Sequence, residues 1–252
     1  MPSVIPAVSR TLAVFEVFAR EQRELSNSEL ARLLSLAESS CSDLLHSLHL
    51  LGYLTRTPRS RRFYPSARLH EVARQITEND SFINLAREAV DQLAERTNES
   101  AFFGVLDRHA AKIAAAQPSR LPLRYILDVG ERVALNASAL GKALLGALPE
   151  EALRAELEQL RLRAVTSDTV IRIDTLTEQL GRGRDCGWYE TRGEGIEGVR
   201  ALAVSGWLND QPVALSLAGP SERMDRNQEI YLRALSEARN ALLADNETTT
   251  TT

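Results

Sequence analysis

The sequence has few cysteines, few aromatic residues and no long apolar run, and these shortages exclude several classes of protein. Its two cysteines, Cys41 and Cys186, stand far apart, which excludes a disulfide framework and a CxxC zinc site. No apolar stretch approaches the roughly 20 residues that span a bilayer. The first residues, Met1-Pro2-Ser3, lack the basic start and apolar stretch of a secretory signal. We therefore expect a cytoplasmic protein with no membrane partner.

The composition that is present is that of an ordinary globular protein. The chain has 252 residues, of which 44% are hydrophobic and 25% charged, so one or two domains with their own cores are expected. The formal net charge is -4, but the charge is distributed unevenly. Residues 1–75 contain ten arginines, no lysine and seven acids, whereas the remainder is net acidic. Contacts with nucleic acid are therefore expected near the N-terminus.

Apolar periodicity predicts three helices in the first part of the chain. The apolar face of the first helix is formed by Val8, Leu12, Phe15 and Ala19. The sequence Ser26-Asn27-Ser28-Glu29 has the form of a capping box and predicts the start of a short second helix. A third helix is predicted over 37–51, closed by a left-handed cap at Gly52. Its apolar stripe is formed by Cys41, Leu44, Leu45, Leu48 and Leu51.

A basic hairpin follows, because strand-like residues 53–56 and 62–64 flank a turn. Three helices followed by such a hairpin are typical of a winged helix-turn-helix, whose third helix enters the major groove. The predicted DNA contacts are Ser39, Ser40, Ser42, Asp43, His46, Arg56, Arg59, Arg61 and Arg62. The alternative is a small stable fold with a solvated basic face. Asp43 either accepts from a cytosine amine or forms a cap or an internal ion pair. No third ligand stands near His46 and His49, so no metal site is expected.

These segments resemble the IclR-type (isocitrate lyase regulator) transcription factors over nearly the whole chain. The likeness rests on residues 7–12, 25–33 and 44–54, and on segments of the second half. It implies an α+β protein of two domains. These are a winged helix-turn-helix at 1–65, a linker helix at 66–80 and a GAF-like α/β effector-binding domain at 81–245. A disordered Thr-rich tail is expected at 246–252. Ala37, Glu38 and Asp43 depart from the usual Pro, Lys and Arg, so the wing should contribute more to DNA binding.

The second half of the chain predicts an alternation of strands and helices. Strands are expected at 101–106, 111–116, 123–127, 199–208 and 212–217, and helices at 82–97, 139–148, 150–161, 175–184 and 226–243. Residues 193–198 match GxGxxG, but they lead into a strand, whereas a dinucleotide fingerprint opens a helix. The sequence has no GxSxG, HExxH or GxxxxGK motif. We therefore expect neither a cofactor nor an enzyme.

Residues 130–143 predict an anion site, because Ser138 is a good N-cap residue. The amides of Ala139, Leu140 and Gly141 would then be unpaired donors at a helix start. The alternative is an ordinary cap that faces water. The stretch is also similar to the segment with which family members hold their effector, with Asn136 and Ser138 in place of the usual His and Thr.

The resemblance also implies the other walls of an effector pocket. The apolar positions are Pro122, Tyr125, Val133 and Val199, and the polar positions are Thr191, Ala201, Ser216 and Ala218. Relatives that bind small glyoxylate-like acids have an Asp, a Cys and two Ser at the last four positions. The two alanines of this chain remove polar groups and add volume, and Tyr125 adds an aromatic face. The expected effector is therefore an organic acid with a larger, less polar body, for which an aromatic ring is one candidate.

The sequence therefore predicts a transcription regulator that binds a double-stranded DNA operator and responds to a small organic acid, without chemistry of its own. One winged domain contacts too little DNA for tight specific binding, so a homodimer or homotetramer on a repeated operator is expected. Repression is the expected output, and activation is the alternative. The alternative is a GAF-like sensor or enzyme whose N-terminal domain contacts protein.

Overall fold

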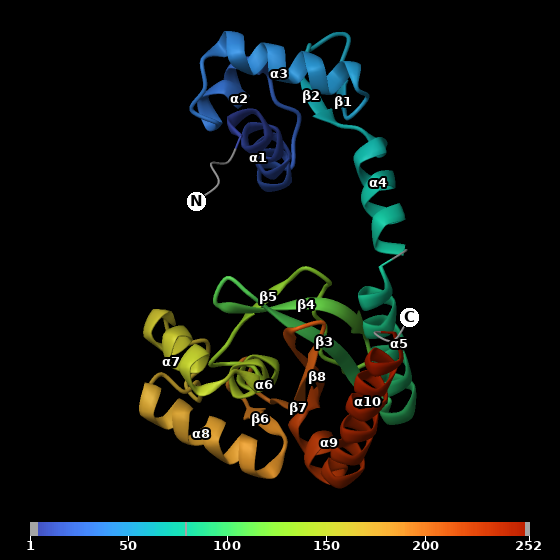
Figure 1. Cartoon of the computed structure of the whole chain (residues 1–252), viewed down its shortest axis with the longest axis vertical. Coiled ribbons are helices and arrows are strands. Elements are labelled where there is room, and N and C mark those ends of the chain that lie inside the picture. The colour runs from blue at the N-terminus through green and yellow to red at the C-terminus, as the bar shows by residue number, and fades with distance from the viewer. Residues whose placement is uncertain (1–4, 79, 250–252) are drawn as a thin grey trace. The chain divides into compact units, whose positions relative to one another are not determined.

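The computed structural model describes residues 5–78 and 80–249, although the side chains of residues 77, 78 and 243–249 are not described. The chain divides into two compact units, Met1–Asp80 and Ser81–Thr252 (Figure 1). The first unit consists of α1 (Pro6–Glu21), α2 (Asn27–Leu33), α3 (Glu38–Leu50), β1 (Leu54–Arg56), β2 (Phe63–Pro65) and α4 (Ala67–Glu78).

The short helix α2 begins at the predicted capping box. The amide of Glu29 donates to the Ser26 hydroxyl at 3.3 Å, and the amide of Ser26 donates to the Glu29 carboxylate at 2.8 Å. Both bonds use amides that a helix start leaves without partners, so this prediction is confirmed. Helix α3 likewise ends beside Gly52, whose φ of 79° is the predicted left-handed conformation.

Helix α1 turns a different face to the core from the one predicted. Its buried residues are Val14, Val17 and Phe18, whereas Val8 and Leu12 are 52% and 59% exposed. The core that selects this face also contains Leu25, Leu30, Cys41, Leu45, Leu48, Leu54 and Phe63. Two apolar stripes therefore run along α1, and only packing against α2 and the hairpin selects the buried one. Leu51 of the predicted α3 stripe is also exposed.

The second unit is a six-stranded antiparallel sheet with helices on both faces (Figure 1). The strand order is β5-β4-β3-β8-β7-β6. The strands are β3 (Ser100–Asp107), β4 (Ala110–Gln117), β5 (Arg132–Ala134), β6 (Tyr189–Arg192), β7 (Val199–Leu208) and β8 (Gln211–Pro220). The helices are α5 (Ser81–Thr97), α6 (Ala139–Ala147), α7 (Glu150–Gln159), α8 (Ile173–Cys186), α9 (Ser221–Arg226) and α10 (Gln228–Thr249).

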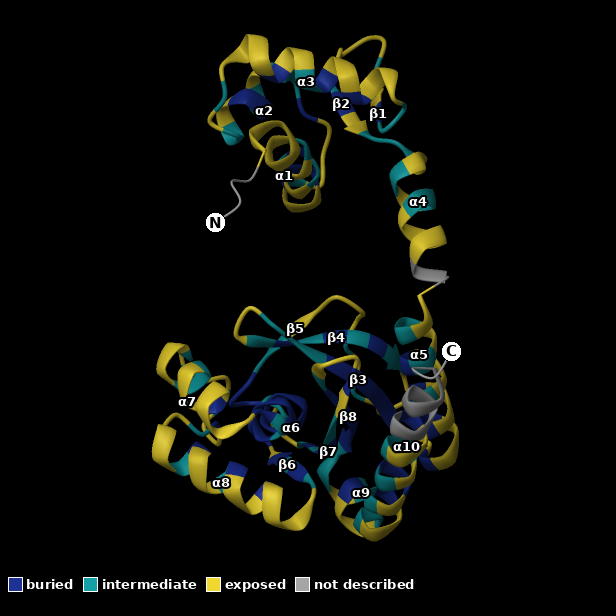
Figure 2. Ribbon diagram, viewed as in Figure 1, coloured by how far each residue is buried: buried dark blue, intermediate teal, exposed yellow. Residues whose placement is uncertain are grey.

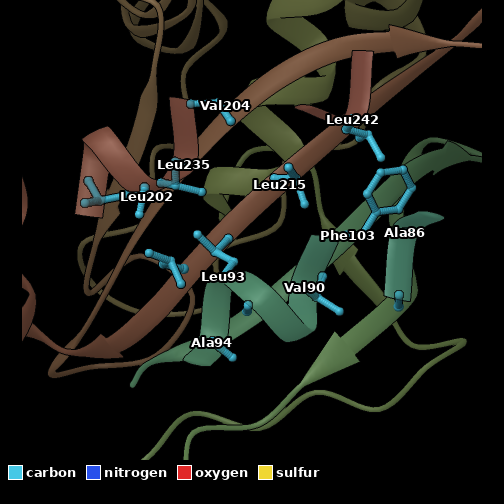
Figure 3. Packing of buried hydrophobic residues seen from close by; sticks show 14 of the residues in the cluster. Ala86, Val90, Leu93, Ala94, Phe103, Leu202, Val204, Leu215, Leu235 and Leu242 are labelled. Carbon is cyan, nitrogen blue, oxygen red and sulfur yellow. The ribbon is translucent and has the colours of Figure 1, made fainter. Parts of the chain in front are cut away.

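The alternation of side chains along the strands divides the sheet between two cores. Phe103, Leu202 and Leu215 pack against α5 and α10 on one face (Figure 3). Their neighbours Phe102 and Ala203 face α6 on the other. Buried residues accordingly alternate with exposed ones on the helices and fill the sheet between them (Figure 2).

Several predicted elements have different bounds in the structure. Residues 123–127 form no strand, although a strand was predicted there. The short strands β5 and β6 were not predicted. The last predicted helix, 226–243, corresponds to α10, and a short helix that was not predicted, α9, precedes it. Helix α10 continues through Thr249, so it includes the first part of the expected tail. Residues 250–252 of that tail lie outside the described residues.

Candidate functional site

Helix α3 presents its predicted polar face to solvent. Ser39, Ser40, Ser42, Asp43 and His46 are all exposed, while Cys41, Leu45 and Leu48 hold the opposite face in the core. Asp43 caps no helix and forms no ion pair with the described residues, so its carboxylate stays open to solvent. The geometry thus leaves one row of short polar groups available along the helix.

The wing arginines fall into two groups. Arg56, Arg59 and Arg61 are exposed, and the Arg56 guanidinium lies over the ring of Phe63, 5.3 Å from its centre. Arg62 instead turns inward, where it donates to the Glu29 carboxylate at 2.8 Å and to the Glu24 carbonyl at 3.1 Å. The charge of Arg62 therefore ties the hairpin to the start of α2, an internal use that the sequence did not indicate.

Glu29 is the centre of this connection. Its carboxylate accepts from the Ser26 amide and from Arg23 at 2.9 Å, in addition to Arg62. The Ser26 amide and the Arg23 guanidinium stabilise the ionised form and lower the pKa of Glu29 to about 2. One carboxylate thus joins the helix cap, the preceding loop and the wing.

The second unit contains a cavity of about 220 Å³ between the sheet and the start of α6. The register of the strands brings the residues of the cavity floor together. Thr191 pairs with Ala201, and Ala201 pairs with Ala218, across β6, β7 and β8. Ser216 lies next to Phe102 of β3, and the Phe102 ring packs edge-on against Tyr125 at 5.8 Å between ring centres. Burial raises the pKa of the Tyr125 phenol above its usual value.

The cavity exists because the strands carry small side chains on this face. In β7 and β8, Leu202 and Leu217 fill the opposite core, whereas Ala201, Ala203 and Ala218 face α6. The alternation of leucine or valine with alanine or serine in 201–204 and 214–218 was a signal for this space.

Helix α6 begins at the cavity with the predicted N-cap, Ser138. Its hydroxyl accepts from the Gly141 amide at 3.0 Å, so Gly141 has no free donor and the prediction of three free amides is wrong in this respect. The amides of Ala139 and Leu140 have no acceptor among the described residues, and both residues line the cavity. Two donors at the positive end of the α6 dipole therefore remain.

The GxGxxG stretch 193–198 forms a loop beside the cavity. Lys142 is 2% exposed and binds both carboxylate oxygens of Glu194, at 2.6 and 2.7 Å. Thr166 and Thr169 donate to the carbonyls of Gly193 and Glu194. Gly193 and Gly198 have positive φ angles, which explains why glycine stands at these two positions of the motif. Burial lowers the pKa of Lys142, and the Glu194 charge opposes this shift.

Nine of the ten predicted effector residues line this single cavity. They are Tyr125, Val133, Ala139, Leu140, Thr191, Val199, Ala201, Ser216 and Ala218. Pro122 is not in the lining. Sequence reasoning missed several wall residues, among them Phe102, Leu127, Arg132, Arg163, Gly195 and Ile196. No local pattern could have found Arg163, because a loop between two helices brings it to the cavity.

Comparison with known proteins identifies the class of molecule that these two units define. The family description "IclR helix-turn-helix domain" matches residues 7–58, and "Bacterial transcriptional regulator IclR C-terminal" matches residues 74–242. The chain therefore belongs to the IclR family, and it is a DNA-binding transcriptional regulator and not an enzyme. The two-domain α+β fold, with its N-terminal helix-turn-helix, is confirmed.

Individual relatives agree with this assignment. The chain is similar to the HTH-type transcriptional regulator XynR of Escherichia coli (strain K12), with 27% identity over 224 residues, 88% of this chain and 89% of XynR. The solved structure of RHA06195 from Rhodococcus sp. RHA1 has a TM-score of 0.82 at 22% identity and covers 98% of this chain and all of its own. An IclR homolog complexed with 4-hydroxybenzoate from Microbacterium hydrocarbonoxydans has a TM-score of 0.76 at 21% identity, covering 96% and 99%.

No group of three or more His, Cys, Asp or Glu side chains in the described part of the chain could hold a metal ion. Among residues 5–78 and 80–249, no helix is long and apolar enough to cross a membrane.

Proposed function

We propose that this regulator binds an aromatic organic acid in the α6 cavity and that the acid alters its affinity for a DNA operator. The observation that supports this best is the lining, which joins two aromatic rings, Phe102 and Tyr125, to two free amides and contains no aspartate or glutamate among the described residues. A DNA-binding regulator of this bacterial family would act in the cytoplasm.

The size of the cavity supports a ring-shaped ligand. An apolar cavity of about 150 Å³ binds benzene, and this cavity holds about 220 Å³. Ala201 and Ala218 supply no hydroxyl. A small polar acid such as glyoxylate would therefore leave part of the cavity empty, and some of its own polar groups would lack hydrogen-bond partners. The relative that was solved with 4-hydroxybenzoate supports the proposal at the level of the fold.

DNA binding is proposed to use the exposed row on α3 for bases and Arg56, Arg59 and Arg61 for phosphates. We also propose that the protein acts as a dimer or as a dimer of dimers. The exposed apolar side chains at the start of α1, Ile5, Val8 and Leu12, support this, because such a stripe is usually covered in solution.

Calorimetric titration with matched acids tests the effector. Benzoate and 4-hydroxybenzoate should bind more tightly than glyoxylate or pyruvate. Tyr125→Ala should cost about 1–2 kcal/mol of aromatic-acid affinity, while Tyr125→Phe keeps the ring and most of the affinity. Ala201→Ser and Ala218→Ser should each raise the affinity for glyoxylate and pyruvate. Tighter binding of glyoxylate than of both aromatic acids by the wild type would contradict the assignment.

A further inference from the structure

The cavity contains one positive charge that no acid in the described chain neutralises. Arg132 and Arg163 both line the cavity. Arg132 is paired with Asp107, with 2.9 Å between Nε and Oδ2. The hydrogen bonds of Arg163 to the described residues involve only its backbone, and its exposed guanidinium has no carboxylate partner there. Arg163 is thus a free cation at the wall of the cavity.

Asn136 holds the backbone of Arg163 in place. The Asn136 side chain is fully buried, its Oδ1 accepts from the Arg163 amide at 3.3 Å, and its Nδ2 donates to the Arg163 carbonyl at 3.0 Å. Nδ2 also donates to the Val170 carbonyl at 2.8 Å. A primary amide pairs with both backbone groups of one residue because it has a donor and an acceptor in one plane.

This contact places Arg163 at the end of the cavity where α6 begins. Asn136 stands just before Ser138, the N-cap of α6, and the free amides of Ala139 and Leu140 follow directly. The backbone of Arg163 is therefore anchored beside the same helix start. Arg163 and the residues that carry the two helix-start amides thus belong to the same cavity lining.

We infer that Arg163 is the residue by which the cavity distinguishes a carboxylate from a neutral group of the same shape, and that Asn136 is its positioning residue. This inference rests on the proposed function. The two amides accept any hydrogen-bond acceptor, including the carbonyl of a neutral amide. A guanidinium adds a charge and a planar pair of donors that match a carboxylate. The effector class is therefore the ionised carboxylic acid, and not its amide or ester.

Titration of acids against their own amides tests this role. We would measure the affinities of benzoate and benzamide, and of 4-hydroxybenzoate and 4-hydroxybenzamide, by calorimetry. The wild type should prefer each acid. Arg163→Gln should lower the acid-to-amide affinity ratio about tenfold, since a hydrogen bond to a charged group contributes that order, and should leave the affinity for the amides unchanged. Arg163→Lys keeps the charge without the planar donors, so its acid-to-amide affinity ratio should lie between those of the wild type and Arg163→Gln.

Arg161→Gln is the matched control. It removes the same charge from the same exposed segment, outside the cavity lining, and should change neither affinity. An unchanged acid-to-amide ratio in Arg163→Gln, with aromatic acids still bound, would overturn the inference and leave the proposed function intact. Failure of the wild type to bind any aromatic acid would overturn both.

The positioning role of Asn136 has its own readout. Asn136→Ala should lower the same acid-to-amide ratio, and in the Arg163→Gln background it should lower the ratio no further. Equal losses for acid and amide in Asn136→Ala would mean that Asn136 only stabilises the wall. Because Arg163 is exposed, its own variants retain the fold, and they test the inference even if the buried Asn136 variant does not fold.

Discussion

At Gly141, helix α6 packs tightly against the turn that precedes it. A Cβ at this position would lie 2.4 Å from the Leu135 Cα and 2.5 Å from the Leu135 carbonyl oxygen. Because both atoms belong to the backbone, no side-chain rotation relieves the clash. The glycine of the Gly-Lys-Ala sequence is thus required by packing at the cavity wall.

Gly141→Ala should therefore destabilise the second unit by about 2 kcal/mol or more, although alanine favours a helix by about 1 kcal/mol. Gly181→Ala is the control, because it lies in α8 with nothing within 4 Å of its Cβ position, and it should stabilise by about 0.5–1 kcal/mol. Urea unfolding followed by tryptophan fluorescence measures both, since Trp188 and Trp207 lie in this unit. A Gly141→Ala variant of unchanged stability would contradict the packing argument.

At the scale of elements, the wing separates arginines that face solvent from one that holds the fold. Replacing Arg59 and Arg61 with alanine should weaken binding to operator and random DNA alike. The log-log slope of affinity against salt should fall by about two, since each phosphate contact contributes about 0.9. Arg172→Ala, an exposed arginine of the second unit, should leave the slope unchanged. Gel shifts at several salt concentrations give these slopes, and an unaltered slope in the double variant would remove the wing from the interface.

The hydrogen bonds of the Glu29 carboxylate make the stability of the first unit sensitive to acid. The pKa of Glu29 is about 2 in the folded chain against 4.5 for the free group, so its ionised form stabilises the fold above about pH 4.5. This contribution should be lost progressively as the pH falls from 4.5 to 2. Glu29→Gln should thus be less stable than the wild type at pH 6, and the two should converge near pH 2. Circular dichroism during urea unfolding follows this, and a constant difference across the range would refute it.

For the whole molecule, effector and operator binding should be coupled reciprocally. If an aromatic acid changes operator affinity by some factor, the operator must change the affinity for the acid by the same factor. Calorimetry of the acid with and without operator, and gel shifts with and without acid, measure the two factors independently. Tyr125→Ala should lose the response at a given acid concentration while keeping the DNA affinity of the free protein. An acid that binds tightly with both factors equal to one would show that the cavity does not regulate DNA binding.

Local patterns in the sequence determined the features that depend on near neighbours. The capping box of Ser26 and Glu29, the cap at Gly52 and the N-cap at Ser138 each involve residues a few positions apart, and all three were predicted. The floor of the cavity was predicted by resemblance to the family. The alternation of large and small side chains in β7 and β8, which leaves space on one face of the sheet, can also be read from the sequence.

Only the tertiary structure decided features in which distant segments compete or combine. Both stripes of α1 have helical period, and packing chose Val14, Val17 and Phe18. Residues 123–127 have strand-like composition but find no partner for a ladder. Arg62 looked like one wing arginine among four, but in the structure its guanidinium pairs with Glu29 of the same unit. Arg163 reaches the cavity through Asn136, because hydrogen bonds between remote residues depend on how the chain folds back and leave no period in the sequence.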